Sequence, residues 1–165
     1  EEFKIIEMKQ CKLLSLDTSS SCSGWSIFLN GEYSSSGVFN LKKIKSSDER
    51  FKQMCTILLY TLNTEQPDIV GIEMTVVTRN AAAQRLLPMI LGVVYGWCVV
   101  HNVEFIMLRP TEWRALISSE KKGRKRDELK KWSIDKVKTL FGKDVSDDEA
   151  DAILIGQAII NKRCR

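Results

Sequence analysis

The chain has 165 residues, of which 44% are hydrophobic, and this length suits one domain with a sizeable core. Its one histidine, His101, excludes a Ser-His-Asp triad, a Cys-His dyad and a multi-histidine metal site within one chain. Its five cysteines are scattered without paired spacing, which argues against a disulfide framework or a cysteine zinc site and indicates a reducing, intracellular compartment. The net charge of +4 conceals a local excess, because residues 120–143 hold ten Lys or Arg against four Asp or Glu.

The first strong pattern is an apolar run, residues 13–16, that stops at Asp17 and passes into a turn of small polar residues. Ahead of it, residues 1–11 are charged and show no secretory signal, so we expect an N-terminal extension of a single domain spanning 1–165. The run predicts a buried central strand with Asp17 at its carboxyl end, where α/β sheets place their sites. The alternative is that Asp17 only begins an Asx-type turn with the following serines.

Four more segments have strand patterns, and they are residues 24–29, 32–41, 69–72 and 103–108. Asn30-Gly31 joins the first two of these, and this dipeptide is the strongest short-range signal for a β-hairpin. The third closes on a second acid, Glu73, so that it repeats the pattern of an apolar run ending in a carboxylate.

Helical patterns occupy residues 46–62, 79–101, 110–116, 127–141 and 146–161. Three strands in sequence followed by strands that alternate with helices predict an α/β fold, with a mixed five-stranded sheet flanked by helices. The helix 79–101 is apolar on nearly every face, which places it in the core or in a dimer interface. Its uncharged run, residues 86–100, is shorter than the roughly 20 residues of a membrane span, so we expect no membrane insertion.

The local basic excess precedes the last two helices. Its Lys and Arg residues are Lys121, Lys122, Arg124, Lys125, Arg126, Lys130 and Lys131. Such a patch predicts contacts with the phosphates of an anionic partner, and the alternative is a solvated loop and helix face.

The acids of the last helix fall into two groups. Ser146, Asp147, Asp148 and Glu149 suit a capped first turn next to the positive end of the helix dipole. Asp151 lies beyond that turn within an apolar stretch, where an ionised side chain is costly unless something compensates it. Asp148 and Asp151 are three residues apart and share one face, while Asp147, four residues from Asp151, is a reserve candidate.

Asp148 and Asp151, together with the strand-end acids Asp17 and Glu73, could converge on one point. Four gathered carboxylates would raise one another's pKa unless cations neutralised them, and carboxylate oxygens favour Mg²⁺ or Mn²⁺. Two such ions can support phosphodiester hydrolysis without a histidine.

The order and spacing of these motifs carry a resemblance. Leu16-Asp17 with its polar turn to Gly24, Gly71-Ile72-Glu73, Asn80 at the start of a long helix, and Asp148-Glu149-Ala150-Asp151-Ala152 resemble the RuvC-type Holliday junction resolvases of the RNase H-like nuclease superfamily. The resemblance covers residues 12–160. Where some relatives carry an aromatic wedge after the glutamate, this chain reads Met74-Thr75-Val76-Val77-Thr78.

The resemblance implies that Asp17, Glu73, Asp148 and Asp151 are catalytic and bind two Mg²⁺ or Mn²⁺ ions. It implies a homodimer, formed through the helix 79–101, that nicks opposed strands of four-way junctions and acts on other branched DNA such as forks. The cytoplasm of a bacterial or phage-infected cell is the expected location. The basic patch, with Arg79 and Asn80, would contact the DNA. Two alternatives remain: a non-nuclease relative with an ATP-binding or carbamoyl-transfer role, and a catalytically idle DNA-binding module.

Overall fold

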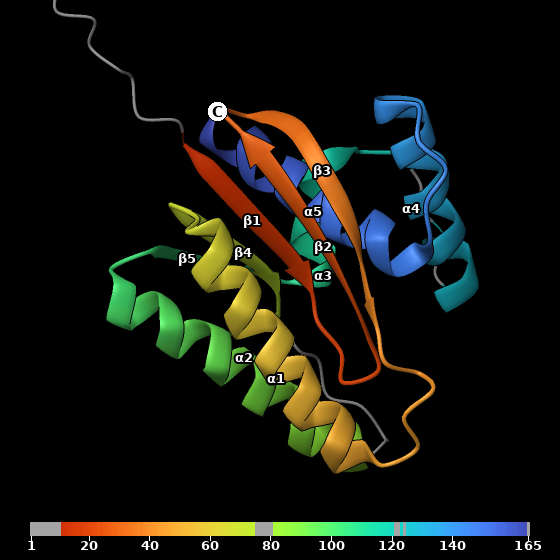
Figure 1. The fold of residues 1–165 in the computed structure, drawn as a ribbon. Coiled ribbons are helices and arrows are strands. Elements are labelled where there is room, and N and C mark those ends of the chain that lie inside the picture. Colours follow the sequence, from red (N-terminus) through yellow and green to blue (C-terminus); the bar gives the residue numbers. More distant parts are fainter. Residues whose placement is uncertain (1–10, 75–80, 121–122, 124, 165) are drawn as a thin grey trace, which may run out of the picture.

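The computed structural model describes residues 11–74, 81–120, 123 and 125–164 of the 165-residue chain. Five strands form one sheet in the order β3-β2-β1-β4-β5 (Figure 1). They are β1 (Lys12–Asp17), β2 (Cys22–Leu29), β3 (Glu32–Asn40), β4 (Ile69–Glu73) and β5 (Glu104–Leu108). β1 pairs antiparallel with β2 and parallel with β4, and β4 pairs parallel with β5. The predicted mixed five-stranded sheet is therefore confirmed, with the Asp17 strand at its centre.

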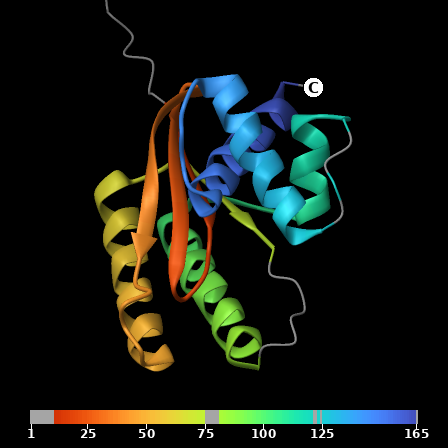
Figure 2. The ribbon, with the colours of Figure 1, turned by 90° about the vertical axis from the view of Figure 1, so that its right-hand side faces the viewer.

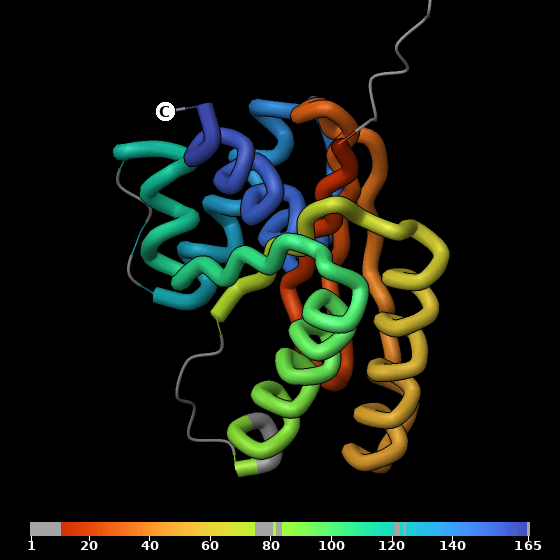
Figure 3. The backbone as a smooth tube through the Cα atoms, turned by 90° about the vertical axis from the view of Figure 1, so that its left-hand side faces the viewer, coloured from red at the N-terminus to blue at the C-terminus, as the bar shows by residue number. Residues whose placement is uncertain are grey.

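Five helices cover the two faces of the sheet. They are α1 (Ser47–Glu65), α2 (Ala81–His101), α3 (Pro110–Ile117), α4 (Arg126–Phe141) and α5 (Asp147–Arg163). Figures 2 and 3 show α1 and α2 on one side, and α5 against the other side with α3 and α4 outside it. Each face has its own buried apolar cluster, so β1 is covered on both sides.

Local sequence signals explain several element boundaries. Asn30 and Gly31 have φ values of 54° and 85°, as the two central residues of a type I′ hairpin turn require. Ser46 Oγ accepts a hydrogen bond of 3.2 Å from Glu49 N and caps α1. Ser146 Oγ accepts one of 3.4 Å from Glu149 N and caps α5, so the predicted start of the last helix is confirmed.

The two-residue period of the strands decides which acids face α5. Leu14 and Leu16 of β1 belong to the cluster beneath α1 and α2, whereas Leu13 belongs to the cluster beneath α5. Asp17 is in phase with Leu13, so its side chain points to the α5 face. None of the described helices is long and apolar enough to cross a membrane.

Candidate active site

Two strand ends and one helix bring four carboxylates together. In β4, Gly71 lies against Ile159 of α5, and Glu73 is two residues further along, so it points to the same face as Asp17. Asp148 and Asp151 lie in the first turns of α5, which packs on that face. The acids that the sequence singled out therefore meet at the carboxyl edge of the parallel strands.

A close approach between α5 and the sheet fixes the position of Asp148. Gly24 pairs with Asp17 in the β1–β2 register, and a Cβ atom on Gly24 would overlap the carbonyl oxygen of Asp148. Only glycine leaves room for this contact. Burial, and then the Asp148 carboxylate, raises the pKa of the Cys22 thiol to about 11, which locates Asp148 beside the start of β2.

The pKa of Asp17 reports how closely the acids lie. Burial raises it well above its ordinary value, and the charges of Asp151, Glu73 and Asp148 raise it further. The Arg114 guanidinium acts in the opposite direction and does not cancel the rise. Asp17 thus interacts electrostatically with all three of the other carboxylates, and so does Asp151.

Glu73 is held by an aromatic donor. The Trp113 indole Nε1 donates a hydrogen bond of 2.5 Å to Glu73 Oε2, and Trp113 is fully buried. Burial raises the pKa of Glu73, and this hydrogen bond opposes the rise because it stabilises the ionised form. Trp113 therefore orients one candidate ligand as well as packing in the core.

Asp151 faces a cation on the neighbouring helix. Arg114 Nη2 lies 3.7 Å from Asp151 Oδ2, and both side chains are largely buried. Burial raises the pKa of Asp151, while the nearby Ser133 hydroxyl and Arg114 lower it. Asp151 Oδ1 and Ser133 Oγ are buried and make no hydrogen bond within the described part of the chain. Ser133 is therefore the neighbouring polar group of Asp151, close enough to lower the pKa of that carboxyl although no hydrogen bond of normal geometry joins them.

Asp147, the reserve candidate, is engaged elsewhere. Its Oδ2 forms an ion pair with Lys130 Nζ of α4, which lowers the pKa of Asp147. Asp147 points to α4, while Asp148 and Asp151 belong to the carboxylate group.

The donor set of this site suits a hard divalent cation. It consists of four carboxylates, and burial and mutual repulsion raise the pKa values of Asp17, Glu73 and Asp151. As it stands, no group of three or more His, Cys, Asp or Glu side chains in the described ranges is arranged to hold a metal ion. Instead, Glu73 accepts a hydrogen bond from Trp113, and Asp151 is paired with Arg114.

No protein-family model and no curated protein sequence matches the chain. Solved structures do match its fold. Thermus thermophilus RuvC in complex with a Holliday junction substrate superposes with a TM-score of 0.69 and 15% identity, over 93% of this chain and 96% of that one. A second Thermus thermophilus RuvC structure gives the same values. The yeast mitochondrial Holliday junction resolvase Ydc2 gives a TM-score of 0.64 and 17% identity, over 93% of this chain and 79% of that one.

The chain has the RNase H-like fold of RuvC. This fold confirms the predicted architecture, including the central strand that ends in Asp17 and the last helix that carries Asp148 and Asp151. The positions of the acids within it come from this chain's own geometry.

The described basic residues of the predicted patch lie on α4 and just before it. Lys125, Arg126 and Lys131 are exposed, whereas Lys130 is paired with Asp147. The other basic candidates and the polar Asn80 lie outside the described residues, and they are Arg79, Asn80, Lys121, Lys122 and Arg124. Phosphate contact by this segment remains a prediction.

Sequence reasoning missed the contributions of Trp113, Arg114 and Ser133 to this site. These residues reach the acids because α3 follows the edge strand β5 directly and α3 and α4 pack on α5. The available signal was a Trp-Arg pair on a short helix behind a strand that neighbours β4.

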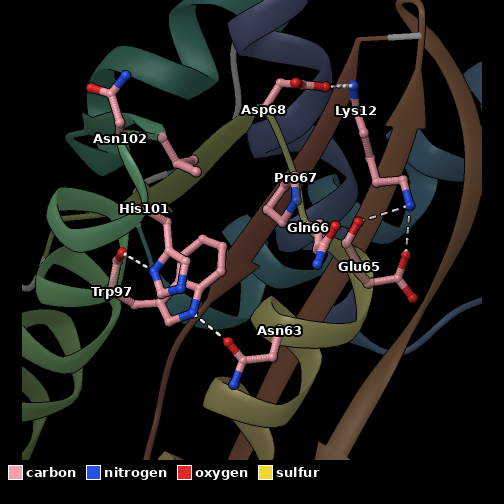
Figure 4. A pocket seen from close by; sticks show the side chains of 10 residues that line it. Lys12, Asn63, Glu65, Gln66, Pro67, Asp68, Trp97, His101 and Asn102 are labelled. Atoms are coloured by element: carbon pink, nitrogen blue, oxygen red, sulfur yellow. Dashed lines mark hydrogen bonds and ion pairs between the residues drawn. The ribbon is translucent and has the colours of Figure 1, made fainter. Parts of the chain in front are cut away.

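A separate cavity of about 510 Å³ lies at the opposite end of the strands, next to their amino ends (Figure 4). Lys12 Nζ donates to the carbonyl and carboxylate oxygens of Glu65 there, and Trp97 Nε1 donates to Asn63 Oδ1. This cavity adjoins the amino ends of β1 and β4, far along the strands from Asp17 and Glu73, so it is not part of the carboxylate site.

Proposed function

We propose that this chain is a metal-dependent endonuclease that acts on branched DNA, including four-way junctions, as a homodimer. One observation carries the proposal: Asp17, Glu73, Asp148 and Asp151 gather at the carboxyl edge of a sheet whose fold is that of RuvC. The structural relatives include two Holliday junction resolvases, one of them in complex with a junction substrate.

The four carboxylates would hold two Mg²⁺ or Mn²⁺ ions. Such ions activate a water molecule and stabilise the leaving oxygen of a phosphodiester. Trp113 would keep Glu73 directed into the site through its indole hydrogen bond. Arg114 would balance the negative charge of the carboxylates while the metals are absent, since its guanidinium lies beside Asp151.

The DNA would run along the exposed basic residues next to the last helices. Lys125, Arg126 and Lys131 are free to face a phosphate backbone, and they lie on or just before α4, which packs against the helix of the site. Base-independent phosphate contacts suit an enzyme that selects DNA by its branching.

The homodimer would form through α2. Its exposed apolar residues include Val100 (80% exposed), Val99 (61%) and Tyr95 (53%), which is unusual for a helix facing water. Beside them, an apolar groove of about 510 Å³ runs between α2 and β5 and is lined by Leu91, Gly92, Tyr95, Phe105, Met107 and Pro88. A second copy would cover this surface and would bring two sites to one junction.

Cleavage of synthetic DNA tests the proposal. Purified protein is incubated with a four-way junction, a fork and plain duplex, each with Mg²⁺, Mn²⁺ or EDTA, and the cuts are mapped. We expect paired nicks in opposed strands of the junction, dependent on the metal and absent in Asp151→Asn. Equal cutting of plain duplex would contradict structure selectivity. Tight junction binding without cleavage in any metal would instead support a catalytically idle DNA-binding module.

A further inference from the structure

Two buried serines join the sheet to the helix that carries Asp148 and Asp151. Ser15 of β1 and Ser26 of β2 are directly opposite each other in the antiparallel register, and neither is exposed to solvent. Their Oγ atoms lie 2.5 Å apart. Ser15 Oγ donates a hydrogen bond of 2.8 Å to the carbonyl oxygen of Ala152, and Ser26 Oγ lies 3.2 Å from the same atom.

These contacts connect the two elements that supply the candidate ligands. Ser15 is two residues before Asp17 and shares its side of β1. Ala152 directly follows Asp151 on α5. The hydrogen-bonded group of Ser15, Ser26 and Ala152 therefore lies two residues from Asp17 on β1 and one residue from Asp151 on α5.

The same stripe of α5 approaches the sheet closely at three successive turns. Asp148 meets Gly24 through its carbonyl group, Ala152 meets the serines, and Gly156 follows four residues later. A Cβ atom on Gly156 would lie 2.6 Å from Ser15 Oγ. The helix backbone thus lies directly on the strands, and only the serine contact among these three is directional.

Packing alone does not account for this pair. A hydroxyl buried between a sheet and a helix costs free energy unless it is hydrogen-bonded, whereas alanine at the same positions carries no polar atom. Each hydroxyl has one proton to donate. Both of the shortest contacts are satisfied when Ser26 donates to Ser15 and Ser15 donates to the carbonyl oxygen of Ala152. A small shift of α5 along β1 would lengthen the hydrogen bond from Ser15 to the Ala152 carbonyl oxygen.

We propose that Ser15 and Ser26 are positioning residues that set the register of α5 against β1, and with it the separation of Asp17 from Asp151. The inference rests on the proposed metal site. It assigns the pair a role in shaping that site without contact between the serines and the substrate.

Metal binding tests the assignment through the Ser15→Ala, Ser26→Ala and double variants. Isothermal titration of the metal-free protein with Mn²⁺ should show about tenfold or greater weakening in the double variant, as for other groups that orient metal ligands. Ser15→Ala should weaken binding more than Ser26→Ala, because Ser15 makes the shorter hydrogen bond to Ala152. Parent affinity in the double variant would overturn the proposal.

A matched control separates positioning from general stability. Cys98 is buried on the opposite face of the sheet, in the cluster beneath α1 and α2. Cys98→Ala should lower the melting temperature and leave the Mn²⁺ affinity unchanged. If it weakened Mn²⁺ binding as much as the serine variants do, the effect of the serines would be one of stability alone and the assignment would fail.

A second measurement works without any metal. In the double variant, amide hydrogen exchange should accelerate about tenfold or more in the first turns of α5 and stay at the parent rate in α1. A parent protein that binds no Mn²⁺ would contradict the proposed function, and the exchange pattern would then decide the serine assignment by itself. Unchanged exchange in α5 would refute it.

Discussion

The Arg114 guanidinium lies between an aromatic ring and a carboxylate: its central carbon is 4.3 Å from the centre of the Trp113 ring, and its Nη2 is 3.7 Å from Asp151 Oδ2. Trp113 in turn donates a hydrogen bond to Glu73. Two adjacent residues of α3 therefore contact acids from β4 and α5, and they connect α3 to the site although neither is an acid.

Replacing this cation should destabilise the protein in a pH-dependent way. Arg114→Gln leaves Asp151 ionised and largely buried without its ion pair, so we expect the free energy of unfolding at pH 7 to fall by about 3 kcal/mol. The loss should shrink at acidic pH, because protonated carboxyls no longer need the cation. Urea unfolding at both pH values measures this. Arg85→Gln, which removes an exposed ion pair with Asp48, should change the stability by well under 1 kcal/mol at either pH.

The raised pKa values predict that the metal-free protein loses stability as pH rises. Burial and mutual repulsion raise the pKa of Asp17, Glu73 and Asp151 in the folded protein. In the unfolded chain the pKa values of such groups are about 4. At pH values between the unfolded and the folded pKa, the native state therefore binds more protons than the unfolded state. The free energy of unfolding contributed by the site therefore falls with increasing pH through that interval. Unfolding in EDTA should show lower stability at pH 8 than at pH 5, and Mn²⁺ should stabilise more at pH 8.

Asp151→Asn tests whether the buried carboxylates cause this pH dependence of stability. The amide cannot ionise, so this variant should be less sensitive to pH than the parent in EDTA. Asp48→Asn, which changes an exposed carboxylate on α1, should keep the parent's pH dependence. Equal pH dependence in the parent and Asp151→Asn would show that the buried carboxylates do not govern it.

The contact between Gly24 and Asp148 predicts a severe effect from a single methyl group. Gly24→Ala would force its Cβ atom against the Asp148 carbonyl oxygen, so α5 must shift away from β2. We expect a loss of about 1 to 3 kcal/mol in the free energy of unfolding and weaker Mn²⁺ binding. Gly142→Ala is the control for a glycine outside the site. It has a positive φ of 66° with open space around it, and it should lose stability without a change in Mn²⁺ affinity.

The proposed dimer is testable through exposed apolar residues on two different helices. Val99→Glu adds a charge to the apolar surface of α2, and we expect it to convert a dimer into a monomer in size-exclusion chromatography with light scattering. Tyr60 of α1 is 71% exposed, and Tyr60→Glu should leave the dimer intact. A monomeric parent, or a dimer that survives Val99→Glu, would contradict an interface through α2.

The sequence predicted the elements well because their signals are local. Alternating and continuous apolar runs, the Asn30-Gly31 turn and the Ser146 cap depend on neighbouring residues, and each appears in the structure. The convergence of Asp17 with Asp151 was inferred from strand ends and helix spacing together with a family resemblance. The contacts of Trp113, Arg114 and Ser133 were not predictable in this way, since they depend on how α3 and α4 pack on α5.

The salt dependence of DNA binding tests the basic surface. Each phosphate neutralised by Lys or Arg contributes about 0.9 to the slope of log affinity against log salt concentration on duplex arms. The triple variant Lys125→Ala, Arg126→Ala and Lys131→Ala should therefore reduce the slope by about two to three, measured by fluorescence anisotropy with a labelled four-way junction in EDTA. Lys52→Ala, which removes an exposed charge on α1, should leave the slope unchanged. A triple variant with the parent's slope would place the DNA elsewhere on the molecule.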